Sequence, residues 1–451
     1  MPEGKTSQEL ALERLDAAIE IVCSEPEACA RDPGRDFTRS RKLPLARLVR
    51  LMVSWGGDTV SVELNDAFGW DGGAPTASAF CQQRAKLRDD VMPRVNEEFL
   101  AQWPHVPFRG RWRLLGVDGT GVALPASDDP RTRVRSNQGE AARNEAHPSM
   151  LYDIRRKTFE GMVWQGSAEQ DEPAAFCELV DALAPAEAPD GSTLVPLVLA
   201  DRNYCTYNDI YHLQEAGCSF CLRASDRWVE WQLGEGGAPE GEFDLDVERL
   251  LVRTRSAEAR PRPGGPGACH RLRSPSARLD ALPPGSRGGW ALRARVVRVA
   301  LPERDEDPDR GDGWTSLVTD LPRDEFGPAE LAELYMMRWD HEVSYDHLKN
   351  ACGMRDPRTR DYGRARMEVW GRLILFNVCS LGARDALACA RDGRAPDLKT
   401  LFKGMRRAVR GEDVDLLAVA ARCTHSVPPA GRHYPRRRRC RSPAKLGHRS
   451  C

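Results

Sequence analysis

Two apolar segments, each ending in an aspartate, most constrain what this chain can fold into. Residues 113–118 read Arg-Leu-Leu-Gly-Val-Asp, and residues 194–201 read Leu-Val-Pro-Leu-Val-Leu-Ala-Asp. Short runs of this kind predict strands that are buried on both faces. A further strand is predicted at 160–164 and a helix at 173–183, between the two segments. This alternation of strands and helices predicts a layered α/β fold.

The composition is that of an ordinary globular protein of several domains. The length of 451 residues predicts about two to four domains. The formal net charge is only -1, so any binding of nucleic acid has to depend on local basic patches. The apolar run at 373–383 is too short to cross a membrane, and no secretory signal is evident. We therefore expect a cytoplasmic protein without a membrane partner.

The 14 cysteines do not predict a zinc site. Cys218 and Cys221 have CxxC spacing, but no second pair follows to complete four ligands. Reduced thiols in the cytoplasm are the expected state.

Residues 1–105 are predicted to form a helical DNA-binding domain. Apolar residues recur at helical spacing from Leu10, a second helix opens near Pro44, and a third begins after Thr76, which is a suitable N-cap. The third helix would read DNA. A basic cluster supports this interpretation and consists of Arg39, Arg41, Lys42, Arg47 and Arg50. The alternative is a helical bundle with a solvated polar face.

The rest of the chain is predicted to be a catalytic core split by a β-rich insertion. The core occupies residues 106–210 and 318–400, and the insertion occupies residues 211–317. The second part of the core carries one helix at 328–350 and another at 363–390. Strands are expected within the insertion at 218–223, 227–232, 249–254, 290–301 and 314–319.

Two segments have an unusual composition. Residues 256–289 are rich in Pro, Gly, Arg and Ser and predict a mobile loop. Residues 401–451 are predicted to hold a C-terminal helix and a basic tail. From residue 431 this tail has seven Arg, one Lys and no acid. It could be a solvated tail or a DNA contact, and the sequence leaves both open.

The helix at 328–350 presents a charged stripe. Tyr335, Arg338, Glu342 and Lys349 fall within a sector of roughly 60° at helical geometry. Taken alone, such a stripe is more often a solvated face with intrahelical ion pairs.

Asp118 and Asp201 change that interpretation, because buried strands would deliver both to one place. Three carboxylates that converge with Glu342 repel one another, and divalent cations relieve that repulsion. Two Mg²⁺ ions about 4 Å apart would activate a water or a 3′-hydroxyl and stabilise the leaving oxygen. The expected chemistry is phosphoryl transfer on a nucleic acid.

These residues resemble a known family. Tyr335-x2-Arg338-x3-Glu342-x6-Lys349 is similar to the YREK signature of bacterial insertion-sequence transposases of the insertion sequence 4 family. The segment 117–120, Val-Asp-Gly-Thr, resembles the first aspartate motif of that family. Ala-Asp-Arg-Asn-Tyr at 200–204 resembles the second. The resemblance covers roughly residues 36–400.

The resemblance implies an RNase H-like mixed sheet flanked by helices, interrupted by the β-rich insertion and preceded by the helical domain. It implies a DDE transposase that moves a transposable element by cut-and-paste: strand nicking, hairpin formation and opening, and strand transfer at terminal inverted repeats. Double-stranded DNA, as transposon ends and as target, would be the partner of a homodimer.

The resemblance also assigns roles to residues. Asp118, Asp201 and Glu342 would be catalytic ligands of two Mg²⁺ ions, which Mn²⁺ could replace. The DNA contacts near the cleaved end would be Tyr335, Arg338 and Lys349. A tryptophan of the insertion would hold a flipped base, with Trp290 and Trp314 as candidates.

The chain departs from the family in several places. Asn203 stands where Gly is usual, and Tyr345 stands where Phe is common. Residues 256–289 and the basic tail match nothing in the family. Two alternatives therefore stay open: a decayed or domesticated transposase that only binds DNA, and another RNase H-like nuclease.

Overall fold

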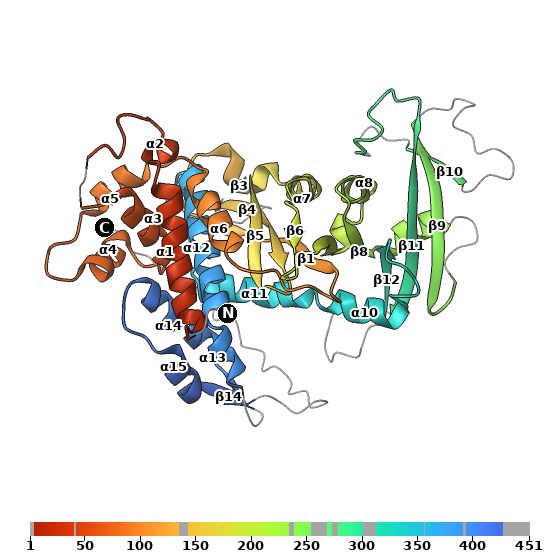
Figure 1. Ribbon diagram of the computed structural model, residues 1–451. Helices are drawn as coiled ribbons and strands as arrows, with labels where there is room; N and C mark the ends of the chain where they lie inside the picture. Colours follow the sequence, from red (N-terminus) through yellow and green to blue (C-terminus); the bar gives the residue numbers. More distant parts are fainter. Residues whose placement is uncertain are drawn as a thin grey trace.

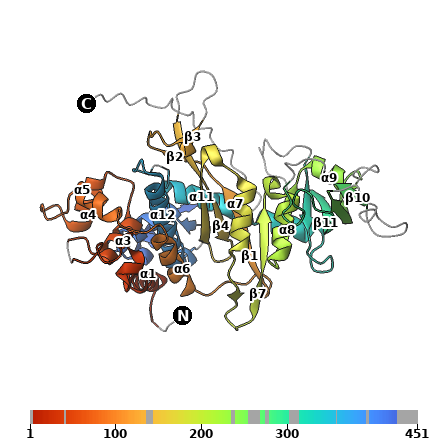
Figure 2. The same ribbon diagram turned by 90° about the horizontal axis from the view of Figure 1, so that it is seen from above.

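The computed structural model shows a long mixed sheet with helices at one end and inserted strands at the other (Figures 1 and 2). The basic tail from residue 431 lies outside the described residues, as do residues 256–267 and 273–277 of the predicted loop. The described residues are 4–39, 42–134, 143–233, 239–253, 268–272, 278–300, 313–355, 357–390 and 394–426.

The sheet is mixed, and its order is β10-β9-β11-β12-β8-β7-β1-β4-β2. The two predicted aspartate strands are its neighbouring central strands, because β1 pairs in parallel with β7. Strand β4 runs antiparallel to β1 and to β5, and β8 runs parallel to β7. These strands are β1 (Trp112–Gly119), β4 (Arg143–Asp153), β5 (Thr158–Gly166), β7 (Thr193–Ala200) and β8 (Ser219–Ala224).

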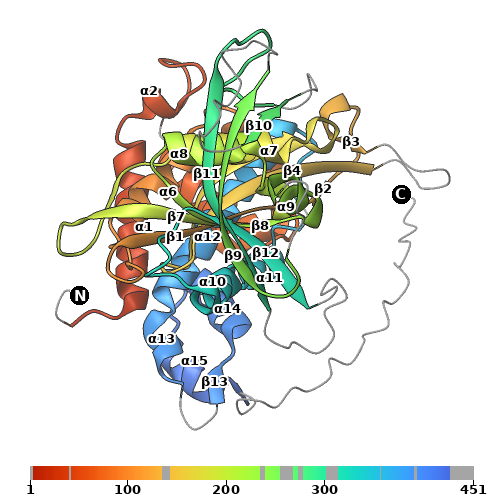
Figure 3. The same ribbon diagram turned by 90° about the vertical axis from the view of Figure 1, so that its right-hand side faces the viewer.

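Helices cover both faces of this sheet (Figure 3). Side chains of alternate residues in β1 pack in two different hydrophobic cores, one on each face of the sheet. Leu115 and Val117 pack with Phe176 of α7, whereas Leu114 packs in the cluster that holds Leu334 of α10. On the first face lie α7 (Glu172–Asp181) and α8 (Tyr207–Glu215). On the second lie α10 (Pro328–Met336), α11 (Trp339–Asn350) and α12 (Tyr362–Gly382).

The inserted strands extend the same sheet beyond β8. They are β9 (Phe243–Val252), β10 (Ala268–Arg271), β11 (Gly289–Ala300) and β12 (Trp314–Thr319). The predicted fold class is confirmed: a mixed α/β sheet flanked by helices, with a β-rich insertion and an N-terminal helical region. Because β8 pairs with β7, the core sheet continues past the predicted boundary at residue 210.

The remaining short elements are strands and single turns, of which β13 and β14 pair with each other in a separate two-stranded sheet. They are β2 (Val122–Leu124), β3 (Arg133–Val134), β6 (Ala186–Glu187), β13 (Arg394–Pro396), β14 (Thr424–Ser426), η1 (Pro130–Thr132), η2 (Ser167–Glu169) and η3 (Arg202–Tyr204).

Two predictions in the insertion are wrong. Residues 227–232 form helix α9 (Asp226–Leu233) and not a strand. Val229 and Gln232 are both buried there, and their spacing of three is helical. Part of the predicted mobile loop is packed, since Leu279 and Leu282 form a small core with Leu251. Two separated leucines in a Pro/Gly-rich stretch give no periodicity from which this packing could be predicted.

The predicted helix at 328–350 is two helices with a tight junction. Met337 N donates to Leu334 O at 3.1 Å, and Arg338 N donates to Tyr335 O at 3.0 Å. These bonds span three residues, as in a 3₁₀ turn, so the winding tightens between α10 and α11. The predicted helix at 363–390 is also divided, into α12 and α13 (Arg384–Ala388).

The N-terminal helices share one hydrophobic core with the helices that follow the sheet. Thr76 caps α5 as predicted, with its side chain accepting from Ala79 N at 3.2 Å. The segment after it forms two helices and not one. The helices are α1 (Ser7–Cys23), α2 (Pro26–Cys29), α3 (Leu45–Ser54), α4 (Val60–Phe68), α5 (Ala77–Arg84), α6 (Val91–Ala101), α14 (Leu398–Val409) and α15 (Leu416–Arg422).

Several cations of this region have partners within the chain. Arg84 is buried on α5 and pairs with Glu368 of α12. Arg50 pairs with Asp16. The exposed face of α5 carries Ser78 and Gln82 instead. DNA reading by this helix stays a prediction, and those two side chains are the ones placed to make it.

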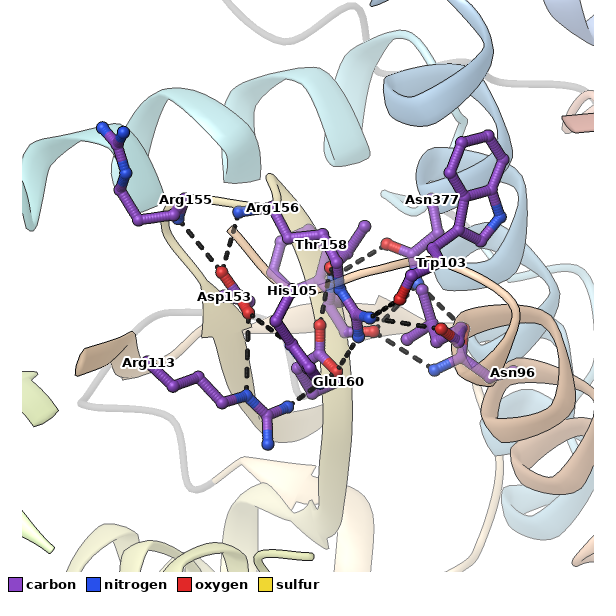
Figure 4. A network of polar contacts seen from close by, with 12 residues as sticks. Asn96, Trp103, His105, Arg113, Asp153, Arg155, Arg156, Thr158, Glu160 and Asn377 are labelled. Carbon is purple, nitrogen blue, oxygen red and sulfur yellow. Dashed lines mark hydrogen bonds and ion pairs between the residues drawn. The ribbon is translucent and has the colours of Figure 1, made fainter. Parts of the chain in front are cut away.

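A buried polar network ties β1, β4 and β5 to the helices (Figure 4). Glu160 of β5 accepts from Arg113 at 3.0 Å and from Arg156 at 2.6 Å. Arg156 also donates to the carbonyls of Leu100 at 3.1 Å and Trp103 at 3.0 Å, at the end of α6. The network fixes strand β1 relative to the helical end. In the described residues, no helix is long and apolar enough to span a membrane.

Replacing Glu160 with Ala should destabilise the protein strongly. Arg113 and Arg156 would stay buried without their shared carboxylate, which costs about 3–5 kcal/mol. Urea unfolding followed by circular dichroism measures the change. Glu13→Ala is the matched control, because its pair with Lys5 is exposed and should contribute nothing measurable. Equal losses in the two variants would contradict the prediction.

Candidate functional site

Asp118 and Asp201 point to the same face of the sheet. Asp118 is two residues beyond Gly116 and four beyond Leu114, whose side chain packs toward α10. Leu199 packs toward the same side, and Asp201 follows it by two residues in extended backbone. Because side chains of a strand alternate between faces, both carboxylates face α11.

Helix α11 lies directly on β1. Tyr345 donates its hydroxyl to the carbonyl of Asp118 at 2.6 Å. The imidazole of His341 is stacked between the rings of Tyr152 and Tyr345, with centroid distances of 5.1 and 4.6 Å. A Cβ at Gly116 would lie 3.1 Å from His341 Nδ1, so this position of β1 accepts no larger side chain without a shift. These contacts set the helix that carries Glu342 against the strand that carries Asp118.

The three acids lie within electrostatic range of one another. The pKa of Asp118 is raised to about 6, chiefly by burial and in smaller part by the charges of Glu342 and Asp201, while Arg338 opposes the rise. Arg338 Nη2 donates to Glu342 Oε1 at 2.9 Å. The site therefore gathers three carboxylates beside one buried guanidinium group.

Tyr335 and Lys349 belong to the same neighbourhood. Burial raises the pKa of Tyr335 to about 12, and its surroundings include Arg338 and Asp201. The guanidinium of Arg338 lies 5.5 Å from the Tyr335 ring. Burial lowers the pKa of Lys349, and the charge of Asp118 opposes that shift. All six predicted residues are thus near one another. Tyr335 and Arg338 are buried, so any contact with DNA would be limited to the atoms that face the site.

Two neighbours of the site were not predicted from the sequence. Arg223 of β8 follows Leu222, which pairs with Ala200, so it lies beside Asp201 in the sheet. Its charge also acts on Tyr335. A cation near the end of an apolar strand was the available signal. The role of Tyr345 depends on a hydroxyl contact that no sequence pattern specifies.

The candidate tryptophans of the insertion both have partners. Trp290 meets Tyr211 edge-on, with ring centroids 5.8 Å apart. Trp314 is half-buried, and the guanidinium of Arg298 lies 5.8 Å from its ring. A flipped-base contact by either stays a prediction.

Cys218 and Cys221 pack in different cores, on opposite faces of the sheet. That placement does not suit a shared metal ion.

The acidic residues fit divalent cations through their donor chemistry. Among the described residues, no group of three or more His, Cys, Asp or Glu side chains is close enough to hold one ion. Mg²⁺, however, is usually bound by one or two carboxylates together with waters and substrate phosphates. Asp118 shared with Asp201 or with Glu342 meets that requirement, and a cation would relieve the unfavourable burial of Asp118.

Comparison with known proteins places this site within a recognised domain. The family model described as Transposase DDE domain matches residues 113–378. That span begins in β1, ends in α12 and includes all six site residues. The search of curated proteins finds no match. Among solved structures, a cryo-EM structure of a piggyBac transposase synaptic complex with hairpin DNA is similar, with a TM-score of 0.46 and 10% identity over 90% of this chain and 80% of that chain.

Binding of a divalent cation should weaken as the pH falls through about 6. Protons compete with the cation for Asp118, whose pKa lies near that value. Calorimetric titration with Mn²⁺ at pH values above and below 6 measures the effect. Asp118→Asn should lose most of the pH dependence along with the affinity. The same affinity on both sides of pH 6 in the unaltered protein would refute the prediction.

Tyr345→Phe should loosen the contact between α11 and β1. The lost hydrogen bond to the Asp118 carbonyl costs about 1 kcal/mol. Tyr362→Phe is the control, because its hydroxyl donates to the Trp164 carbonyl at 3.2 Å. Denaturant unfolding should show losses of the same size in both variants. Mn²⁺ affinity should fall in Tyr345→Phe alone, and an equal fall in both would contradict this.

Proposed function

The chain belongs to the transposase DDE domain family, and we propose that it is a metal-dependent DNA transposase of the cut-and-paste type. It would nick DNA at the terminal inverted repeats of its insertion sequence, form and open a hairpin, and transfer the freed strand to target DNA. The YREK residues support placing it with the insertion sequence 4 family.

One observation supports the proposal most. Two aspartates from adjacent parallel strands face a glutamate on a helix that packs against the first strand. Such convergence of acids is unfavourable unless cations share it. Asp118, Asp201 and Glu342 are accordingly proposed as the residues that would hold two Mg²⁺ ions. The bound cations would activate the attacking oxygen and stabilise the leaving one.

The basic residues around the acids would hold the DNA backbone. Lys349 and Arg223 are proposed to contact phosphates on either side of the scissile one. Arg338 would orient Glu342 through their hydrogen bond and add positive charge at the cleaved end. Tyr335 packs under Arg338 and would keep its guanidinium group in place.

Double-stranded DNA is the proposed partner, both as transposon ends and as target, in the bacterial cytoplasm. A homodimer would bring two ends together. The N-terminal helices would contact the end sequences through exposed polar side chains such as Gln82.

Asp118→Asn and Glu342→Gln should each reduce strand cleavage by roughly four orders of magnitude. The substrate is a duplex that carries the terminal inverted repeat of the element, and Mg²⁺ or Mn²⁺ is added. Both variants should still bind that duplex in a gel-shift assay, because they remove no phosphate contact. Glu330→Gln, a first-turn acid of α10, should cleave like the unaltered protein.

The products separate the alternatives. A decayed or domesticated protein would bind the ends and cleave nothing. Another RNase H-like nuclease would cut without strand-joining products. Cleavage that survives Asp118→Asn would refute the proposed site.

A further inference from the structure

The backbone pairing that aligns β1 with β7 ends before it reaches the carboxylates. The described ladder runs from Trp112 and Val195 to Gly116 and Leu199. Asp118 and Asp201 each follow two residues later. Beyond the ladder, Asp118 pairs with Met150 of β4, whereas β7 pairs with β8 only as far as Ala200, the residue before Asp201. Something other than this ladder has to set the distance between them.

His147 contacts the backbone next to Asp118. It is buried on β4, and a Cβ added to Gly119 would overlap its Nε2. The imidazole therefore packs directly against the residue that follows Asp118. Gly119 faces α7, opposite to Asp118, so the contact is made from the face that α11 does not cover.

Glu172 connects His147 to the turn that follows Asp201. Its Oε1 lies 2.8 Å from His147 Nε2, and its carboxylate also hydrogen-bonds the side chain of Asn203. Asn203 is two residues beyond Asp201. These contacts hold the pKa of Glu172 below its usual value, chiefly because of His147. Only 10% of the His147 side chain and 21% of the Glu172 side chain are exposed, so water screens the pair incompletely.

We propose that His147, Glu172 and Asn203 form a positioning bridge that sets the separation of Asp118 and Asp201 and thereby the affinity for divalent cations. The inference rests on the proposed function of the two aspartates. The three residues are not expected to touch substrate or reacting atoms. They would act through the backbone segments that carry Asp118 and Asp201. Residues in such supporting positions typically change metal affinity by roughly 10–100-fold when they are replaced.

The proposed bridge gives the side chain of Asn203 a structural role in this chain. The resembled family usually has Gly there, which offers no side chain to Glu172. The exposed side chain of Asn203 hydrogen-bonds the partly buried carboxylate of Glu172 and so anchors the turn η3 directly after Asp201.

Mn²⁺ titration of the full-length protein, followed by electron paramagnetic resonance, tests the bridge. Glu172→Gln and Asn203→Ala should each weaken Mn²⁺ binding about 10-fold. The double variant should be little worse than Glu172→Gln, because both changes break one chain of contacts. Asn203 is exposed, so Asn203→Ala is expected to fold. Thermal unfolding without metal checks this for each variant.

Asp181→Asn is the matched control. Asp181 ends the same helix α7 and lies 2.8 Å from His212, which repeats the histidine–carboxylate contact away from the aspartates. Its Mn²⁺ affinity should equal that of the unaltered protein. An equal loss of Mn²⁺ affinity in this control would overturn the proposed bridge. The bridge is also overturned if Glu172→Gln and Asn203→Ala both keep their Mn²⁺ affinity while Asp118→Asn loses it. If Asp118→Asn itself binds Mn²⁺ normally, the proposed metal site fails instead.

Discussion

The parallel pairing of β1 with β7 is the constraint on which the site depends. It places the ends of two buried strands side by side, and the alternation of side chains then turns Asp118 and Asp201 to one face. A shift of the register by one residue would send one carboxylate into the opposite core. Packing of Leu114 and Leu199 on one side, and of Val117 on the other, fixes that register.

Convergence of the acids is locally unfavourable and is stabilised by its surroundings. Asp118 is desolvated beside two other carboxylates, which raises its pKa to about 6. Arg338 and the Gly119 N–H, which donates to Asp118 Oδ1 at 2.9 Å, oppose that effect. The folding free energy comes from elsewhere, mainly from the two large cores and the buried network around Glu160. Functional sites commonly conflict with local stability in this way.

The remainder of the chain builds outward from this centre in two directions. On one side, β9, β11 and β12 prolong the sheet. On the other, the N-terminal helices pack on α12, and the buried Arg84–Glu368 pair ties α5 to it. A DNA-binding surface on those helices would therefore be coupled rigidly to the sheet that carries the acids.

The aspartate strands and the helix of Glu342 are predictable from the sequence alone, because buried strands and helical stripes have short periods that neighbouring residues reveal. The sequence also predicted a DDE transposase domain and the six residues that the structure brings near one another. The three-dimensional structure was needed to find the break between α10 and α11, the helix at Asp226–Leu233 and the packing of Leu279. The same holds for Arg223, Tyr345 and the His147–Glu172 contact. The packing of Leu279 and the contacts of Arg223, Tyr345 and His147 join residues far apart in the chain, and no local pattern encodes which distant surface a side chain will meet.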